Sequence, residues 1–126
     1  MSGIDHVALS AADYETSVKF YEAALAPLGL RTLLELDNDG SRIAGFGDTR
    51  PFFWVGDGAA LRGRLHVCFA AKTRAEVDAF HAAATAAGAR DNGAPGLRPH
   101  YHPSYYGAFV LDPDGHNIEA VCHAPE

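Results

Sequence analysis

The chain has 126 residues, of which 48% are hydrophobic and 21% are charged, and its formal net charge is −6. A chain of this length predicts a single domain with a core of its own, and the composition is that of a globular protein and not of a disordered one. The negative charge and the scattered lysines and arginines argue against nucleic acid or a membrane surface as the partner. A small anionic substrate is not excluded, because a single arginine can act locally.

The first residues and the cysteines indicate where the protein works. Polar residues follow Met1 in place of an apolar leader, and no apolar run approaches the about 18 residues of a membrane-spanning helix. Cys68 and Cys122 lack CxxC spacing and fall in apolar segments, so we expect both to be reduced thiols of the core. We therefore expect a cytoplasmic protein that does not enter a membrane.

The chain repeats itself, and this repeat organises the later predictions. Residues 5–29 and 65–88 align when His6 is matched with His66. Each copy begins with a short apolar strand around a His-Val pair, continues through a polar break into an amphipathic helix and stops at a glycine. Other matched pairs are Val7 with Val67, Phe20 with Phe80 and Ala24 with Ala84.

The helix of the first copy is predicted from the spacing of its apolar residues. Asp13 or Thr16 can cap its start, and Gly29 can stop it. Apolar residues three and four positions apart form one stripe of a helix. The residues of this stripe are Val18, Tyr21, Leu25 and Leu28.

The helix of the second copy is slimmer. Val77, Phe80 and the alanines between 82 and 87 form its apolar face, which indicates close packing of the helix on a sheet. Thr73 followed by Glu76 predicts a capping box at its start.

Three strand-like segments follow each helix. The first of these in the second copy, within 89–103, is only a poor candidate for a strand because it is rich in glycine and proline. The sequence DPDGHN predicts a tight hairpin turn between the last two segments. We predict one α+β domain, residues 1–126, made of two tandem βαβββ modules at about 3–58 and 62–124 that pack side by side. The other segments are Leu30–Leu36, Ser41–Gly47, Pro51–Val55, Tyr106–Leu111 and Asn117–His123.

Strand alternation places three polar residues on one face. His6 shares its face with Ala8 and Ser10, His66 with Cys68, and Glu119 with Val121 and His123. The alternate residues of these strands suit a core. We therefore expect a sheet with its helices on one face and a cleft on the other, and these three residues in the cleft.

The doubled βαβββ order and the closing segment FVLDPDGHNIEAV resemble the vicinal-oxygen-chelate superfamily, which includes glyoxalases, bleomycin resistance proteins and dioxygenases. The resemblance covers residues 4 to about 123 and implies a curved sheet with a cleft, where metal ligands come from the first and last strand of each module. Those positions are His6, His66 and Glu119 here. Aligning PFFWV with NIEAV places Phe53 at the fourth position, where it cannot bind a metal. By alternation Phe53 would be an apolar wall for substrate, with Phe52 and Trp54 turned to the helices.

Two imidazoles and a carboxylate with open positions match Fe, Mn, Zn, Ni or Co better than Ca²⁺. The resemblance implies lyase, isomerase or dioxygenase chemistry on a small molecule that chelates the metal through neighbouring oxygens. The alternative is a metal-free protein that sequesters an aromatic or antibiotic-like ligand in its cleft. A homodimer is also implied, and whether the cleft uses one chain or two stays open.

The segment from residue 98 to 106 gathers ring-bearing polar side chains that would form the rim of the cleft. Such residues suit general acid or base catalysis and hydrogen bonding to substrate. A solvated loop anchored by aromatic rings is the alternative. The candidates are His100, His102 and Tyr105, beside Glu119, for catalysis, and Tyr101 and Arg98, with Phe53, for substrate binding; His116, in the turn, is expected in solvent.

Overall fold

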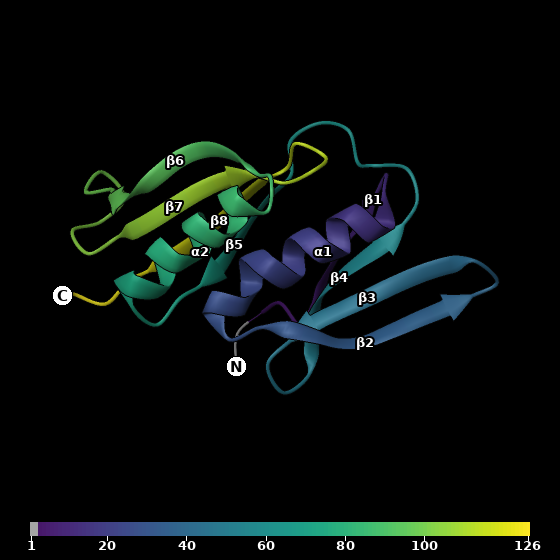
Figure 1. Ribbon diagram of the computed structural model, residues 1–126. Coiled ribbons are helices and arrows are strands. Elements are labelled where there is room, and N and C mark those ends of the chain that lie inside the picture. The colour runs from purple at the N-terminus through teal and green to yellow at the C-terminus, as the bar shows by residue number, and fades with distance from the viewer. Residues whose placement is uncertain (1–2) are drawn as a thin grey trace.

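Two four-stranded sheets with the same strand order make up the structure (Figure 1). The computed structural model describes residues 3–126. The orders are β1-β4-β3-β2 and β5-β8-β7-β6, and in each sheet the first and last strands of a module pair in parallel. The predicted α+β fold with a doubled βαβββ order is confirmed. The strands are β1 (Val7–Ala11), β2 (Arg31–Asn38), β3 (Ser41–Gly47), β4 (Pro51–Asp57), β5 (His66–Ala70), β6 (Arg90–Leu97), β7 (Tyr106–Leu111) and β8 (Asn117–Cys122).

The first helix consists of α1 (Tyr14–Leu25) and a short 3-10 turn, η1 (Ala26–Leu28). Asp13 caps it, because its Oδ1 accepts a hydrogen bond from the backbone N–H of Thr16 at 3.1 Å. Of the two predicted caps, Asp13 is therefore the right one. Gly29 ends the helix with a φ of 78°, a left-handed conformation that glycine adopts without strain.

The second helix, α2 (Arg74–Ala86), begins with a variant of the predicted capping box. Thr73 Oγ1 accepts a hydrogen bond from the backbone N–H of Glu76 at 3.1 Å, as expected. The Glu76 carboxylate accepts one from the backbone N–H of Lys72 at 2.8 Å, one residue earlier than the box requires. Among the described residues, no helix is long and apolar enough to span a membrane.

The segment expected to be a poor strand forms β6. This strand lies at the edge of the second sheet and pairs with β7 alone. An edge strand tolerates Pro95 because one side of its backbone needs no ladder partner. Its register with β7 shifts on both sides of Gly93, so the glycines that made the strand look poor also bend it.

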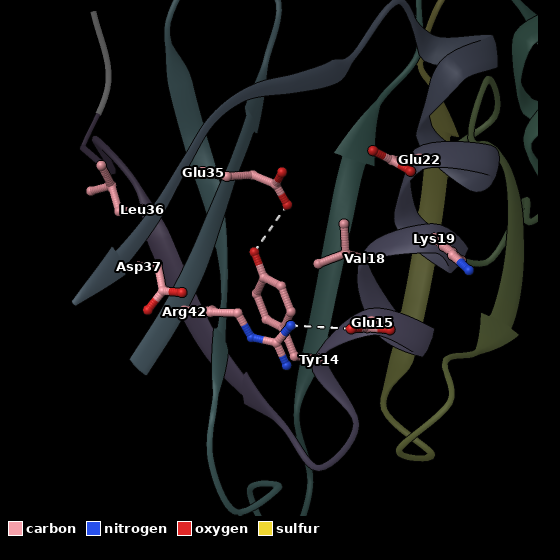
Figure 2. A pocket seen from close by; sticks show the side chains of 9 residues that line it. All are labelled: Tyr14, Glu15, Val18, Lys19, Glu22, Glu35, Leu36, Asp37 and Arg42. Carbon is pink, nitrogen blue, oxygen red and sulfur yellow. Dashed lines mark hydrogen bonds and ion pairs between the residues drawn. The ribbon is translucent and has the colours of Figure 1, made fainter. Parts of the chain in front are cut away.

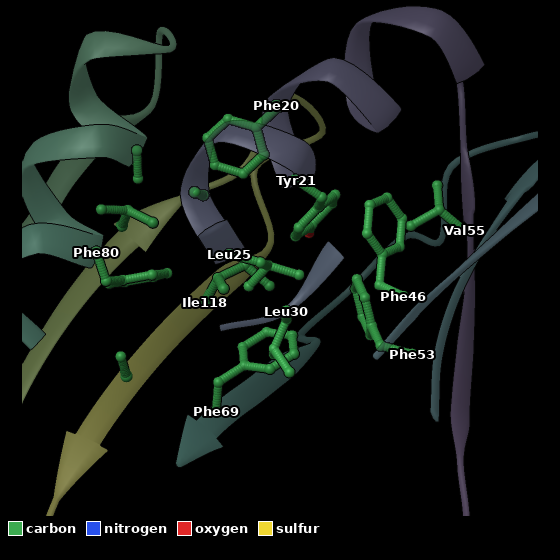
Figure 3. Close-up of a cluster of buried hydrophobic side chains, with 14 of the residues drawn as sticks. Phe20, Tyr21, Leu25, Leu30, Phe46, Phe53, Val55, Phe69, Phe80 and Ile118 are labelled. Carbon is green, nitrogen blue, oxygen red and sulfur yellow. The ribbon is translucent and has the colours of Figure 1, made fainter. Parts of the chain in front are cut away.

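The two halves share one aromatic core (Figure 3). The helices α1 and α2 pack on each other, and each covers one face of its own sheet. Tyr21 of α1 lies with its ring centroid 4.9 Å from that of Phe53 on β4, and Phe53 lies 5.1 Å from Phe69 on β5. Burying one such side chain stabilises the fold by about 1.5–3 kcal/mol. Because Phe53 and Phe69 belong to different modules, neither module has a closed core of its own.

The predicted position of Phe53 is wrong. Phe53 is fully buried among the core aromatics and faces the helices. The strand register explains why: Val7 pairs with Phe53, and its repeat equivalent Val67 pairs with Ile118. Phe53 therefore corresponds to Ile118. The equivalent of Glu119 in the first module is Trp54, one residue later, and alternation turns Trp54 to the outer face.

A buried hydrogen bond joins the modules. The Tyr21 hydroxyl of α1 donates to the Asp112 carboxylate at 2.5 Å. Asp112 also accepts bonds from the backbone N–H groups of Asp114 at 2.9 Å and His116 at 2.8 Å, which fixes the predicted turn before β8. Gly115 completes this turn with a φ of 84°. The same carboxylate therefore sets the entry into β8 and ties that strand to the helix of the other module.

Two predictions of exposure are wrong. His116 is 3% exposed and not in solvent, because the turn wraps inward around Asp112. Cys68 is exposed, because it points to the face of β5 opposite the core residue Phe69. Cys122 is buried, as expected, and both cysteines are free.

Replacing Tyr21 by Phe removes the bond to Asp112 and leaves a buried carboxylate with one donor fewer. We expect the free energy of unfolding, measured in urea, to fall by about 1–3 kcal/mol. Tyr14→Phe, on the same helix, is the control. Its hydroxyl bonds to the partly exposed Glu35 at 3.1 Å, so the loss should be about 1 kcal/mol or less. Equal losses in the two variants would contradict the assignment.

Candidate functional site

Glu119 is a buried carboxylate on the outer face of the second sheet. It is 2% exposed, whereas its neighbours Ile118 and Ala120 belong to the core on the opposite face, as alternation predicts. One of its oxygens, Oε1, lies 3.1 Å from His66 Nε2. The other, Oε2, accepts a hydrogen bond from the hydroxyl of Tyr105. A buried charge requires such partners, since an uncompensated carboxylate costs several kcal/mol.

The hydrogen bonds of His66 fix its tautomer. Its Nδ1 lies 3.0 Å from the backbone oxygen of Asn117, which can only accept, so Nδ1 carries the proton. In the neutral ring, Nε2 then presents a lone pair toward Oε1 of Glu119. Two acceptors at this distance are held together either by a proton between them or by a metal ion that both atoms bind from one side. The second case is the usual arrangement of a histidine ligand whose other nitrogen is hydrogen-bonded.

The pairing of strands places a row of residues across the outer face. Cys68 pairs with Glu119, Glu119 with Phe109, and Phe109 with Gly93. The Phe109 ring also stacks on His66, at 6.1 Å between centroids and 23° between planes. Partial burial raises the pKa of the Cys68 thiol, and the negative charge of the nearby Glu119 raises it further. Cys68 is therefore a neutral thiol beside the carboxylate and not a ready nucleophile.

Tyr105 ties the loop after β6 to Glu119. Partial burial raises the pKa of Tyr105, and its hydrogen bond to Glu119 raises it further, so the hydroxyl stays protonated and donates. Its backbone oxygen accepts from the N–H of Arg98 at 2.7 Å, and its own N–H donates to the oxygen of His102 at 3.1 Å. The predicted rim is thus a closed turn whose last residue reaches the buried carboxylate.

His102 contacts His123, a residue that was not predicted as part of the site. His102 Nδ1 accepts from the backbone N–H of Ser104 at 3.1 Å, so its proton is on Nε2 and points to Nδ1 of His123, 2.5 Å away. His123 must then carry its own proton on Nε2. Strand alternation had already placed His123 on the face of Glu119, and this was the signal that could have found it.

The remaining rim residues are more exposed. Tyr101 is 57% exposed, and its ring lies 4.8 Å from that of Tyr105 and 4.2 Å from that of His100. These rings form a short aromatic ladder that leads away from Glu119 into solvent. Tyr101 can therefore meet a ligand at the mouth of the site, whereas His100 lies one ring farther out.

His6 does not join His66 and Glu119 within one chain. Its Nδ1 bonds to Asp5 at 2.8 Å, and Asp5 also pairs with Arg50 at 2.6 Å. Over residues 3–126 no three His, Cys, Asp or Glu side chains are placed to hold a metal ion together. His6 and His66 line one cavity of about 630 Å³, but Glu119 does not line it. The three predicted ligands are therefore divided between two places that share His66, namely its contact with Glu119 and the cavity that it lines with His6.

A second cavity, of about 450 Å³, lies between α1 and the strands β2 and β3 (Figure 2). Within it, Arg42 bonds to Glu15 at 3.2 Å and lies over the Tyr14 ring at 4.5 Å. Partial burial and then the bond to Glu35 raise the pKa of Tyr14 to about 12. None of the predicted site residues lines this cavity.

Comparison with known proteins bears on the whole chain. Residues 3–120 match the family described as the Glyoxalase/Bleomycin resistance protein/Dioxygenase superfamily. A glyoxalase/bleomycin resistance protein from Albidiferax ferrireducens is 30% identical, with a TM-score of 0.78 over 98% of this chain and 100% of that one. No curated protein matches.

Two more distant structures share the fold. The fosfomycin resistance protein FosX from Listeria monocytogenes, an E126Q mutant solved with Mn(II) and 1S,2S-dihydroxypropylphosphonic acid, is 20% identical, with a TM-score of 0.70 over 96% of this chain and 90% of that one. A glyoxalase I mutant from Zea mays is 21% identical, with a TM-score of 0.69 over 94% of this chain and 44% of that one.

The contact between Tyr105 and Glu119 predicts a shift in a phenol pKa. In the metal-free protein, Glu119→Gln removes a neighbouring negative charge, so the pKa of Tyr105 should fall toward its ordinary value of 10, while burial keeps it above that value. Phenolate absorbance at 295 nm measures it, and Tyr105→Phe assigns the signal. Glu35→Gln, which acts on Tyr14, is the control. A Tyr105 transition that ignores Glu119→Gln would show that the two groups do not interact.

Proposed function

Because the chain belongs to the glyoxalase/bleomycin resistance protein/dioxygenase superfamily, we propose that it is an enzyme that binds a divalent metal ion through His66 and Glu119. Its substrate is a small molecule that chelates this metal through two neighbouring oxygens. One observation carries the proposal: His66 Nε2 lies 3.1 Å from Oε1 of a buried carboxylate, while Nδ1 of the same ring lies 3.0 Å from the backbone oxygen of Asn117.

The donor set fits a transition metal with open positions. One imidazole and one carboxylate, joined by a second imidazole, suit Fe, Mn, Zn, Ni or Co. A bound ion of this kind acts as a Lewis acid that stabilises negative charge on a substrate oxygen. That FosX was solved with Mn(II) supports the class of metal. Lyase, isomerase and dioxygenase reactions all use this property.

The residues around the ligands have separate tasks. Tyr105 occupies Oε2 of Glu119, which leaves Oε1 for the ion, and Asn117 orients the ring of His66. Loss of such supporting bonds weakens metal binding by about 10–100-fold. His123 offers its Nε2–H to a ligand, and His102 is the positioning residue that fixes this tautomer.

The third ligand is His6 from a second copy of the chain. Because the helices cover the inner faces of both sheets, the outer face of each sheet is left for another molecule. The outer face of the first sheet is apolar: Leu34 and Leu36 of β2 are 43% and 44% exposed, near Trp54 of β4. Exposed apolar surface of this kind is typical of an interface. A homodimer that joins this face to the Glu119 face of its partner brings the divided ligands together.

A metal-free protein that sequesters an aromatic ligand is the second candidate. It is favoured by the rings on the same face as Glu119, those of Phe109, Tyr105 and Tyr101. In that case His66 and Glu119 are joined by a proton, and substituting them changes ligand binding only through loss of shape. Metal analysis separates the two candidates.

We expect the protein, dialysed against Mn(II), Co(II), Ni(II) or Zn(II), to retain about one equivalent of at least one ion per chain. His66→Ala and the isosteric Glu119→Gln should lose it, and thermal melting should confirm that both variants fold. His81→Ala is the control, since this histidine of α2 bonds to Asp91 of β6 at 2.9 Å, on the helix side of the sheet and not on the face of Glu119. Metal content that is absent in the parent, or unchanged in both variants, would refute the proposal.

Mixing two defective variants tests whether the site is shared between copies. His6→Ala and Glu119→Gln are each expected to bind metal weakly. In a shared site, a mixed dimer has one site with both defects and one with neither, so unfolding and refolding the two together should restore tight binding in about a quarter of the sites. A site built within one chain predicts no recovery at all. Mixing His66→Ala with Glu119→Gln is the control, because both changes fall on the same module and can leave no site intact.

A further inference from the structure

Arg98 lies on the face of the second sheet that holds Glu119. Its guanidinium carbon is 5.5 Å from the centroid of the Phe109 ring, and Phe109 pairs in register with Glu119. The Phe109 ring also stacks on His66. A guanidinium, a phenyl ring and the proposed metal ligands therefore follow one another across β6, β7 and β8.

Two glycines of β6 make room for this guanidinium. A Cβ on Gly93 would lie 2.9 Å from Cδ1 of Phe109 and 3.2 Å from Nη2 of Arg98, and a Cβ on Gly96 would lie 3.2 Å from Nη1. Both distances to Arg98 are too short for an undisturbed contact. Nη2 also donates to the backbone oxygen of Ala94 at 2.8 Å. The glycines of β6 thus leave room for the ring and the guanidinium close to the strand.

The positive charge of Arg98 has no partner in the part of the chain that the structure describes. Arg42 and Arg50 each pair with a carboxylate, whereas no ion pair within residues 3–126 involves Arg98. A guanidinium has five N–H donors in a planar fork, and the bond to Ala94 uses one of them. The others are free for a ligand.

We propose that Arg98 binds a carboxylate of the substrate, so that the substrate is a flat, anionic chelator. A carboxylate matches the planar fork through two parallel hydrogen bonds, and a flat ligand can lie over Phe109 in the plane of the guanidinium. Two strand spacings separate β6 from β8, about 10 Å, so the carboxylate and the chelating oxygens lie at opposite ends of a small molecule. This inference rests on the proposed metal function and names the substrate class for that site.

The test compares two probes that differ in charge alone. We expect 3,4-dihydroxybenzoate to bind the Co(II)-loaded protein at least about tenfold more tightly than 3,4-dihydroxybenzamide in calorimetric titration, because a charge-assisted pair replaces a neutral contact. Arg98→Gln should abolish this preference, because it weakens binding of the benzoate much more than binding of the benzamide. Gly96→Ala keeps the charge but displaces the guanidinium, and should reduce the preference. Arg90→Gln is the control, because it makes the same change on β6 at the position that pairs with Leu111.

A preference that survives Arg98→Gln, or that Arg90→Gln removes equally, overturns the proposal. Failure of the metal function gives a different result: neither of the two dihydroxy probes then binds more tightly with Co(II) than without it. The role of Arg98 is still measured in that case with benzoate on the metal-free protein. Binding of benzoate must be weakened by Arg98→Gln and not by Arg90→Gln, and equal binding to the two variants again overturns the proposal.

Discussion

The packing of α1 and α2 between the two sheets is the constraint on which the rest of the structure depends. Each sheet gives one face to the shared core, where Phe53 and Phe69 meet across the modules. Glu119 and the residues that contact it lie on an outer face. Because each helix covers the inner face of its own sheet and the helices pack on each other, the outer faces point away from the core that joins the modules. One cavity, which His6 and His66 line, takes residues from both modules.

The partners of Glu119 explain how its carboxylate can be buried. A charged group inside a sheet is tolerated when each of its oxygens has a partner, and Tyr105 and His66 supply one each. Two acceptors, the Glu119 oxygen and the lone pair of His66, then face each other. This pair is stable only when a proton or a metal ion joins the two atoms. The compensation of this buried charge therefore also brings the two proposed metal ligands, His66 and Glu119, together.

The sequence predicted the repeat, the helices with their caps and the outward turn of Glu119, because these depend on local periodicity and on short capping motifs. It placed Phe53 on the wrong face because all three residues of the run Phe52–Trp54 are large and apolar, so alternation leaves no polar residue to fix the register. The predicted match of β4 with β8 was one residue out of register, since Phe53 corresponds to Ile118 and not to Glu119, and a shift of one residue reverses every face. His123 was missed because its partner His102 is distant in sequence and meets it only through the closed loop.

The corrected register shows how one scaffold serves two purposes. The row across the first sheet runs from Ala8 through Trp54 and Gly45 to Leu34, and a Cβ on Gly45 would lie 2.6 Å from the Trp54 ring. The equivalent row across the second sheet holds Glu119 where the first has Trp54. The first module thus presents a flat apolar surface over a glycine, and the second presents the carboxylate and the residues that we propose as metal ligands. The same strand position therefore carries apolar packing in one module and a buried charge in the other.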